Sequence, residues 1–184
     1  YGRMIFSDSI SGFYSPSQID HCKQWTVLIH SFSNTYAMTG WRIGAVTGPE
    51  ELIKRMGLLF ETINSCVPPF IQVAAAHVLR KGAFVSKYMV NEYEQRRNLI
   101  ISGLNSINGI SCYRSEGTFY AFANVKKICH SSEEFSNNLL SVKKIATCPG
   151  IYFGKNGEGY VRFCFAASKE KISQAINHMQ DLYN

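Results

Sequence analysis

Residues 31–44 read Ser31-Phe32-Ser33-Asn34-Thr35-Tyr36-Ala37-Met38-Thr39-Gly40-Trp41-Arg42-Ile43-Gly44. The run before them, Thr26 to His30, is apolar and β-branched and predicts a buried strand. In open α/β sheets, ligands usually bind at loops that leave the carboxyl ends of strands. The hydroxyls of Ser31 and Ser33 and the cation of Arg42 are groups that hold anions such as phosphate. The pattern is compatible with an anion-binding loop, and a polar turn followed by a second strand, Trp41 to Val46, with a surface arginine explains it equally well.

Composition indicates a globular protein. The chain has 184 residues, enough for one substantial core or two small ones. Hydrophobic residues make up 46% and charged residues 17%, which is typical of a folded rather than a disordered chain. The net charge of +6 is moderate and comes from scattered basic residues. Because no basic stripe or nucleic-acid-binding module accompanies them, we expect no nucleic-acid partner.

The cysteines and the hydropathy of the chain indicate in which cellular compartment we expect the protein. Six cysteines stand far apart, without a C-x-x-C pair and without metal-like spacing to the five histidines, so we expect reduced thiols and no metal site. No apolar run approaches the roughly 18 residues of a membrane span, and these 184 residues contain no segment that resembles a signal peptide, so we expect a cytoplasmic protein that does not bind membranes. The chain opens on Tyr1 without an initiator methionine, and we expect that this is not the native start.

Three helices are predicted after the central stretch. The first begins near Pro49 and runs to about Asn64, with a proline and two acids in its first turn. The second runs from Phe70 to Arg80 and ends at Gly82. The third is long, from about Phe84 to Ile107, and we expect it to connect two lobes. We place the domain boundary at its start, which gives residues 1–83 and 84–184.

The last part of the chain predicts a compact α+β lobe. Its order is strand, strand, helix, strand, strand, helix. A serine is expected to cap each of the two helices, Ser131 for the first and Ser168 for the last. The predicted segments are Ile110 to Tyr113, Thr118 to Ala123, Ser131 to Val142, Ile145 to Cys148, Tyr160 to Ala166 and a final helix after Ser168.

Residues 31–44 closely resemble the signature of class I pyridoxal-phosphate aminotransferases, the aspartate and aromatic aminotransferase-like group. Three later stretches resemble the same family in the same order: Gly117-Thr118-Phe119-Tyr120-Ala121-Phe122, Pro149-Gly150 through Phe153-Gly154, and Gly159-Tyr160-Val161-Arg162-Phe163-Cys164-Phe165-Ala166. The resemblance implies an α/β fold, the C-terminal part of the fold type I transferases. Residues 1–83 then complete the large cofactor-binding domain, and residues 84–184 form a whole small domain.

The resemblance also implies roles for five residues. Tyr1 falls where the family has a tyrosine that bonds the cofactor's phenolic oxygen. Ser31 and Arg42 match ligands of the cofactor phosphate, and Ser33 either joins them or shapes the turn. Arg162 matches the arginine that clamps the substrate α-carboxylate, which a guanidinium holds bidentately. The implied cofactor is pyridoxal 5'-phosphate, and the implied substrates are an amino acid and a 2-oxo acid.

Asn34 departs from the family. It stands at the position of the Schiff-base lysine, which serves both as nucleophile and as general base. An asparagine amide has no basic form near neutral pH and can do neither. We therefore predict that this chain, as written, is an inactive transaminase, whether Asn34 is natural or engineered.

The family's N-terminal part supplies the other half of the pocket and lies outside this sequence. We expect a parent protein about twice as long, or a chain completed by a second chain or a homodimer partner. Two alternatives to a transaminase stay open. One is a C–S β-lyase of the same fold, which uses the same residues, and the other is a non-catalytic relative that binds cofactor weakly or serves in interactions.

Overall fold

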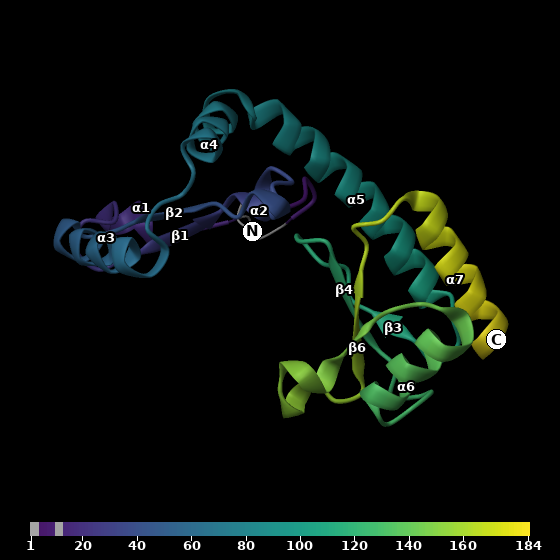
Figure 1. Ribbon diagram of the computed structural model, residues 1–184. Coiled ribbons are helices and arrows are strands. Elements are labelled where there is room, and N and C mark those ends of the chain that lie inside the picture. Colours follow the sequence, from purple (N-terminus) through teal and green to yellow (C-terminus); the bar gives the residue numbers. More distant parts are fainter. Residues whose placement is uncertain (1–3, 10–12) are drawn as a thin grey trace. The chain divides into compact units, whose positions relative to one another are not determined.

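The computed structural model describes residues 4–9 and 13–184. These residues divide into two compact units: 4–5 and 13–90 lie in the first, and 6–9 and 91–184 in the second. The boundary falls inside the long helix α5 (Ala83–Asn105), which Figure 1 shows as one continuous element. That these units are parts of a large and a small domain of one enzyme stays a prediction.

The first unit consists of short elements around a two-stranded ribbon. In chain order they are α1 (Ser17–Asp20), β1 (Leu28–Ser31), α2 (Phe32–Thr35), the 3-10 turn η1 (Thr39–Trp41), β2 (Gly44–Thr47), α3 (Glu50–Asn64), α4 (Pro69–Lys81) and the start of α5. β1 and β2 pair antiparallel, from Leu28 opposite Thr47 to Ser31 opposite Gly44. The helices at 50–64 and 69–81 fall where the sequence predicts them.

Two predictions for the ribbon are wrong. β1 is not a buried strand, because Ile29 at its centre is 80% exposed. A ribbon of two strands cannot bury both of its faces, so an apolar run is not sufficient for burial here. The second strand does not begin at Trp41: residues 39–41 form a 3-10 turn, and Arg42 then adopts the left-handed conformation (φ 49°). Pairing with β1 starts only at Gly44.

A small core holds the central loop against α4. Phe32, Met38 and Ala75 are buried, and Tyr36 and Val78 are among the partly buried side chains packed on them. The small Ala75 side chain lets the loop approach the helix closely. Gly82 then caps the C-terminus of α4, as predicted.

The second unit is built on a four-stranded antiparallel sheet of order β3-β4-β6-β5. Its strands are β3 (Ser111–Cys112), β4 (Tyr120–Asn124), β5 (Cys148–Pro149) and β6 (Tyr160–Cys164). Its helices are the second half of α5, α6 (Ser132–Asn138) and α7 (Lys169–Tyr183). The π-helical segment η2 (Leu139–Lys143) follows α6, and η3 (Gly150–Phe153) and η4 (Lys155–Gly157) are 3-10 turns. The predicted order of strands and helices is confirmed.

One face of this sheet is buried beneath helices. Ala121 and Val161 are fully buried, while alternate residues of β4 and β6 are exposed or half-buried. Figure 1 shows α7 (yellow) alongside the second half of α5, where Ile176 packs so tightly on Gly103 that a Cβ there would lie 2.3 Å from the Ile176 Cδ1. The Ser168 hydroxyl accepts a hydrogen bond from the Lys171 N–H at 3.4 Å and caps α7, as predicted.

Within residues 4–9 and 13–184, every helix is too short or too polar to cross a membrane.

Candidate functional site

Ser31 stands at the junction of β1 and α2. It is the last residue of the strand and the N-cap of the short helix, where its Oγ accepts a hydrogen bond from the Ser33 N–H at 3.2 Å. The Ser31 side chain is exposed, and its hydroxyl proton can still be donated outward. Ser33 contributes its backbone N–H to this turn, and the role of its hydroxyl stays a prediction.

Arg42 lies at the other end of the same loop. Its backbone is left-handed, a conformation that costs a non-glycine residue about 1–2 kcal/mol. One guanidinium nitrogen, Nη1, donates to the Thr39 carbonyl at 3.0 Å. Among the residues that the structure describes, no carboxylate pairs with Arg42. The remaining N–H groups of this exposed cation are therefore available to an anion.

The two ends of the loop meet at the end of the ribbon. Ser31 pairs with Gly44, and the Phe32 N–H donates to the Ile43 carbonyl at 3.3 Å. A Cβ at Gly44 would lie 2.7 Å from the His30 carbonyl oxygen, so this close pairing needs glycine. The register brings a hydroxyl and a guanidinium, eleven positions apart in sequence, to one end of the β1–β2 ribbon.

Asn34 sits in α2 between these two groups in sequence and is half-buried. Over the described ranges its side-chain amide has no hydrogen-bond partner. The amide is a donor and an acceptor but not a base, so position 34 holds a polar group without proton-transfer chemistry.

Arg162 lies on β6, one of the two inner strands of the second-unit sheet. In β6 it stands opposite Phe122 of β4 and Cys148 of β5. Its guanidinium carbon lies 4.3 Å from the centre of the Tyr120 ring and 4.7 Å from that of Phe153. In the described part of the chain it forms neither an ion pair nor a hydrogen bond, and it is half-buried. Such a guanidinium can receive a carboxylate.

The predicted site residues do not all lie in one unit of the structure. Ser31, Ser33, Asn34 and Arg42 belong to the first unit, and Arg162 belongs to the second. Tyr1 lies outside the described residues. Their predicted roles stay predictions. Sequence reasoning missed the two rings beside Arg162, although both lie in the quoted stretches that contain G-x-F-Y and Phe153-Gly154.

The Asp20 carboxylate, which has a lowered pKa, stabilises the turn that precedes β1. Asp20 accepts hydrogen bonds from the N–H groups of Trp25 at 2.7 Å, Thr26 at 2.9 Å and Cys22 at 3.0 Å. These bonds, chiefly that of Trp25, lower the pKa of Asp20 to about 2. Asp20 therefore fixes the turn that leads to the strand and is not placed for acid–base chemistry at neutral pH.

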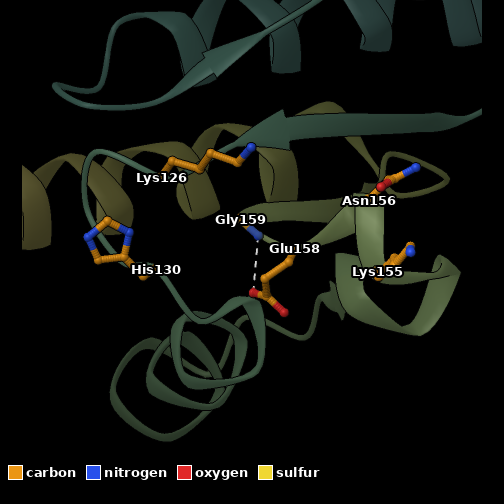
Figure 2. Close-up of a pocket in the computed structure, with 6 residues that line it drawn as sticks. All are labelled: Lys126, His130, Lys155, Asn156, Glu158 and Gly159. Atoms are coloured by element: carbon orange, nitrogen blue, oxygen red, sulfur yellow. Dashed lines mark hydrogen bonds between the residues drawn. The ribbon is translucent and has the colours of Figure 1, made fainter.

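A separate basic hollow of about 450 Å³ lies in the second unit. Figure 2 shows its lining side chains and the hydrogen bond that the Glu158 carboxylate accepts from the Gly159 N–H. The residues that line it are Lys126, His130, Lys155, Asn156, Glu158 and Gly159. It contains none of the predicted site residues.

Comparisons with known proteins identify the family of the chain. The family model described as aminotransferase class I and II matches residues 1–179. An aspartate aminotransferase of Pyrococcus horikoshii is 40% identical over 84% of this chain, and the aromatic-amino-acid aminotransferase 2 of Thermococcus litoralis is 37% identical over 96% of it.

Solved structures show the same fold. The aromatic aminotransferase from Pyrococcus horikoshii OT3 superposes with a TM-score of 0.91 at 35% identity, over 99% of this chain and 48% of that one. The aspartate aminotransferase from Rhizobium meliloti gives a TM-score of 0.90 at 29% identity, over 98% of this chain and 47% of that one.

The chain spans about half the length of the curated relatives that it matches, 40% and 48% for the two named above. It corresponds to the C-terminal part of their fold, and the family depends on pyridoxal phosphate. The predicted resemblance and fold class are both confirmed. By the match over residues 1–179 and by relatives that share up to 40% of its sequence, the chain belongs to the class I and II aminotransferases.

Proposed function

We propose that the protein to which this chain belongs transfers an amino group between an amino acid and a 2-oxo acid with pyridoxal phosphate. The observation that carries the proposal is the loop at residues 31–44. It presents the Ser31 hydroxyl and the Arg42 guanidinium from one end of the ribbon, within a chain that matches the aminotransferase family over residues 1–179.

The donor set suits the phosphate group of the cofactor. A hydroxyl proton at Ser31 and the free N–H groups of Arg42 donate to phosphate oxygens, and an arginine stays charged at every physiological pH. When bound, pyridoxal phosphate supplies an electron sink for charge that develops at the substrate Cα. Ser31 and Arg42 hold its charged end in place.

Position 34 does not suit the aldehyde end of the cofactor. The Asn34 amide neither attaches to the cofactor covalently nor takes a proton from the substrate Cα. Loss of a general base alone typically lowers a rate about 10²–10⁴-fold. The chain as written therefore binds cofactor through the phosphate only, and weakly, and it does not turn over.

Arg162 binds the substrate carboxylate in this proposal. A bidentate guanidinium–carboxylate pair fixes the orientation of the substrate as well as its charge. Orientation decides which bond at Cα is broken, because only a well-aligned substrate benefits from proximity to the reacting groups. Half-burial strengthens the pair relative to one in bulk water.

The test is an activity assay of the Asn34→Lys variant, made in a protein extended to the full length of the relatives. We expect amino transfer from aspartate or an aromatic amino acid to 2-oxoglutarate, and none from the Asn34 form. Release of pyruvate and a thiol from a cysteine conjugate, without amino transfer, would instead identify a C–S β-lyase.

Asn34 itself favours a second candidate, a non-catalytic relative that retains the fold for interaction. The same assay separates the two. If the extended Asn34→Lys protein binds cofactor but neither transfers amino groups nor eliminates from any common amino acid, the non-catalytic function is supported and the transaminase proposal fails.

A further inference from the structure

The sheet face around Arg162 is aromatic. Tyr120 and Phe122 of β4 pair with Cys164 and Arg162 of β6, so all four side chains project from the same face. The residues between them are buried on the opposite face. The face that is turned away from the helices thus carries several rings around a single guanidinium.

Two of these rings contact the Arg162 guanidinium. Tyr120 and Phe153 lie 4.3 Å and 4.7 Å from its carbon, measured to the ring centres, well inside the roughly 6 Å reach of a cation–π interaction. Rings attract the flat face of a guanidinium, and the N–H donors lie at its edge. A guanidinium held by rings therefore keeps its edge free for a carboxylate.

Phe153 comes from a turn that leaves it little freedom. Phe153 is the last residue of η3, and η4 begins two residues later, after Gly154. A Cβ at Gly150 would lie 2.1 Å from the carbonyl oxygen of Gly157, so the two turns touch backbone to backbone. The Ile151 N–H donates to the Ser132 hydroxyl at 3.2 Å, and Ser132 is fully buried.

Further contacts hold the turn and the ring of Phe153 in place. Glu158 accepts hydrogen bonds from the N–H groups of Ser132 at 2.5 Å and Gly159 at 3.1 Å, the second of which is drawn in Figure 2. On its other side the Phe153 ring meets Phe122 edge to face, at 6.0 Å and 88°. The ring is fixed by its turn and by its neighbour.

Core packing does not account for this placement, because Phe153 is 52% exposed. We infer that Phe153 is a positioning residue, which together with Tyr120 holds the Arg162 guanidinium so that its N–H edge faces a substrate carboxylate. The inference deepens the proposed function and rests on the role given there to Arg162.

The first test measures how tightly the protein binds 2-oxoglutarate, by isothermal titration calorimetry. We expect Phe153→Leu to weaken binding about fivefold. Phe153→Tyr should retain the binding of the wild type, because tyrosine at residue 153 keeps a ring over the cation and leucine does not. The matched control is Tyr152→Leu. It removes a ring from the same turn, one whose hydroxyl donates to Glu133, and it should leave binding unchanged.

A double-mutant cycle separates positioning from direct contact with the ligand. If Phe153 acts through Arg162, Phe153→Leu has no further effect in an Arg162→Gln background. An equal loss in both backgrounds would overturn the inference, because the ring would then contribute without the guanidinium.

A second readout needs no ligand. The Nε–H resonance of Arg162, assigned by its absence in Arg162→Gln, should be shifted upfield by the rings and should move towards that of free arginine in Phe153→Leu. An unchanged resonance together with unchanged 2-oxoglutarate binding would overturn the inference. A moved resonance in a protein that shows no Arg162-dependent binding supports the placement by Phe153 and contradicts the proposed function.

Discussion

At the scale of single residues, two side chains carry predictions: Asn34 for the proposed chemistry and Arg97 for the stability of the fold. In the proposed function, Asn34 occupies the position where the family's reaction needs a base. Arg97 is a charge at 1% exposure, and its two terminal nitrogens donate to the Asp8 carboxylate at 2.8 and 2.7 Å. Arg114 pairs with the same carboxylate. Buried charges persist only when they are paired in this way.

The Asp8 carboxylate should make the stability of the protein depend on pH. Its hydrogen bond from Arg97, and the charges of Arg97 and Arg114, lower the pKa of Asp8 below its ordinary value of 3.8. A carboxylate with a lowered folded-state pKa stabilises the fold at pH values above 3.8, and this contribution is lost as the pH falls through the folded-state pKa.

We therefore expect Asp8→Asn to lower the free energy of unfolding at pH 6. The difference from the wild type should shrink as the pH is lowered below the ordinary Asp value. Urea denaturation at pH 6 and at successively lower pH values measures it. A difference that stays constant with pH would show that the carboxylate charge is not responsible.

At the scale of elements, the helices were predicted more accurately than the strands. The cap at Ser168 and the glycine at the end of α4 are local signals, and the structure confirms them. The exposure of β1 and the left-handed Arg42 depend on what packs beside them, which no local pattern encodes.

Some residues of the candidate site could also be predicted from local sequence, and others could not. The hydroxyl and the cation of the loop at residues 31–44 could be picked out from their residue types. The rings beside Arg162 could not, because they reach it through strand pairing and through the turn at residues 150–153.

The cap of α7 gives a test at this scale. Ser168→Ala removes the hydroxyl that accepts from the Lys171 N–H, and an N-cap of this kind is worth about 1 kcal/mol. We expect thermal or urea unfolding to show a loss of that size. Ser168→Asp serves as the control, because aspartate is also a good N-cap, and it should retain the stability of the wild type. Equal losses in both variants would contradict a capping role.

The turn that carries Phe153 gives a second test at the scale of elements. Gly150→Ala places a methyl group 2.1 Å from the Gly157 carbonyl oxygen, and the two turns must separate to admit it. We expect a lower melting temperature together with a weakened cation–π contact at Arg162. Gly154→Ala offers a contrast, since nothing lies within 4 Å of the added Cβ and only its φ of 109° opposes the change.

At the scale of the whole molecule, exposed apolar surface is concentrated on the first unit. None of the residues of α3 is buried, and Leu59 and Ile63 are 59% and 69% exposed. Leu52, Met56, Leu59, Phe60 and Ile63 share one side of the helix. Large exposed apolar patches are typical of interaction surfaces. Because the chain spans about half the length of its relatives, we propose that the remaining half of the family fold covers this one.

This surface predicts that the chain by itself associates at micromolar concentration. Leu59→Glu and Ile63→Glu should each shift the sedimentation distribution towards the monomer. Leu58→Glu, the same change on a different side of the same helix, should leave it unaltered. Equal effects at all three positions would mean that added charge, and not this face of α3, controls association.

The measurement that tests the central claim most directly is the attachment of cofactor at position 34. The Asn34 protein and its Asn34→Lys variant are incubated with pyridoxal phosphate and reduced with borohydride, and the labelled peptides are identified by mass spectrometry. We predict that the cofactor is fixed to residue 34 in the lysine variant and that the peptide carrying Asn34 is unlabelled. Two results would contradict the account. One is stable labelling of the peptide at Asn34, and the other is a lysine variant in which cofactor is fixed to other residues but not to residue 34.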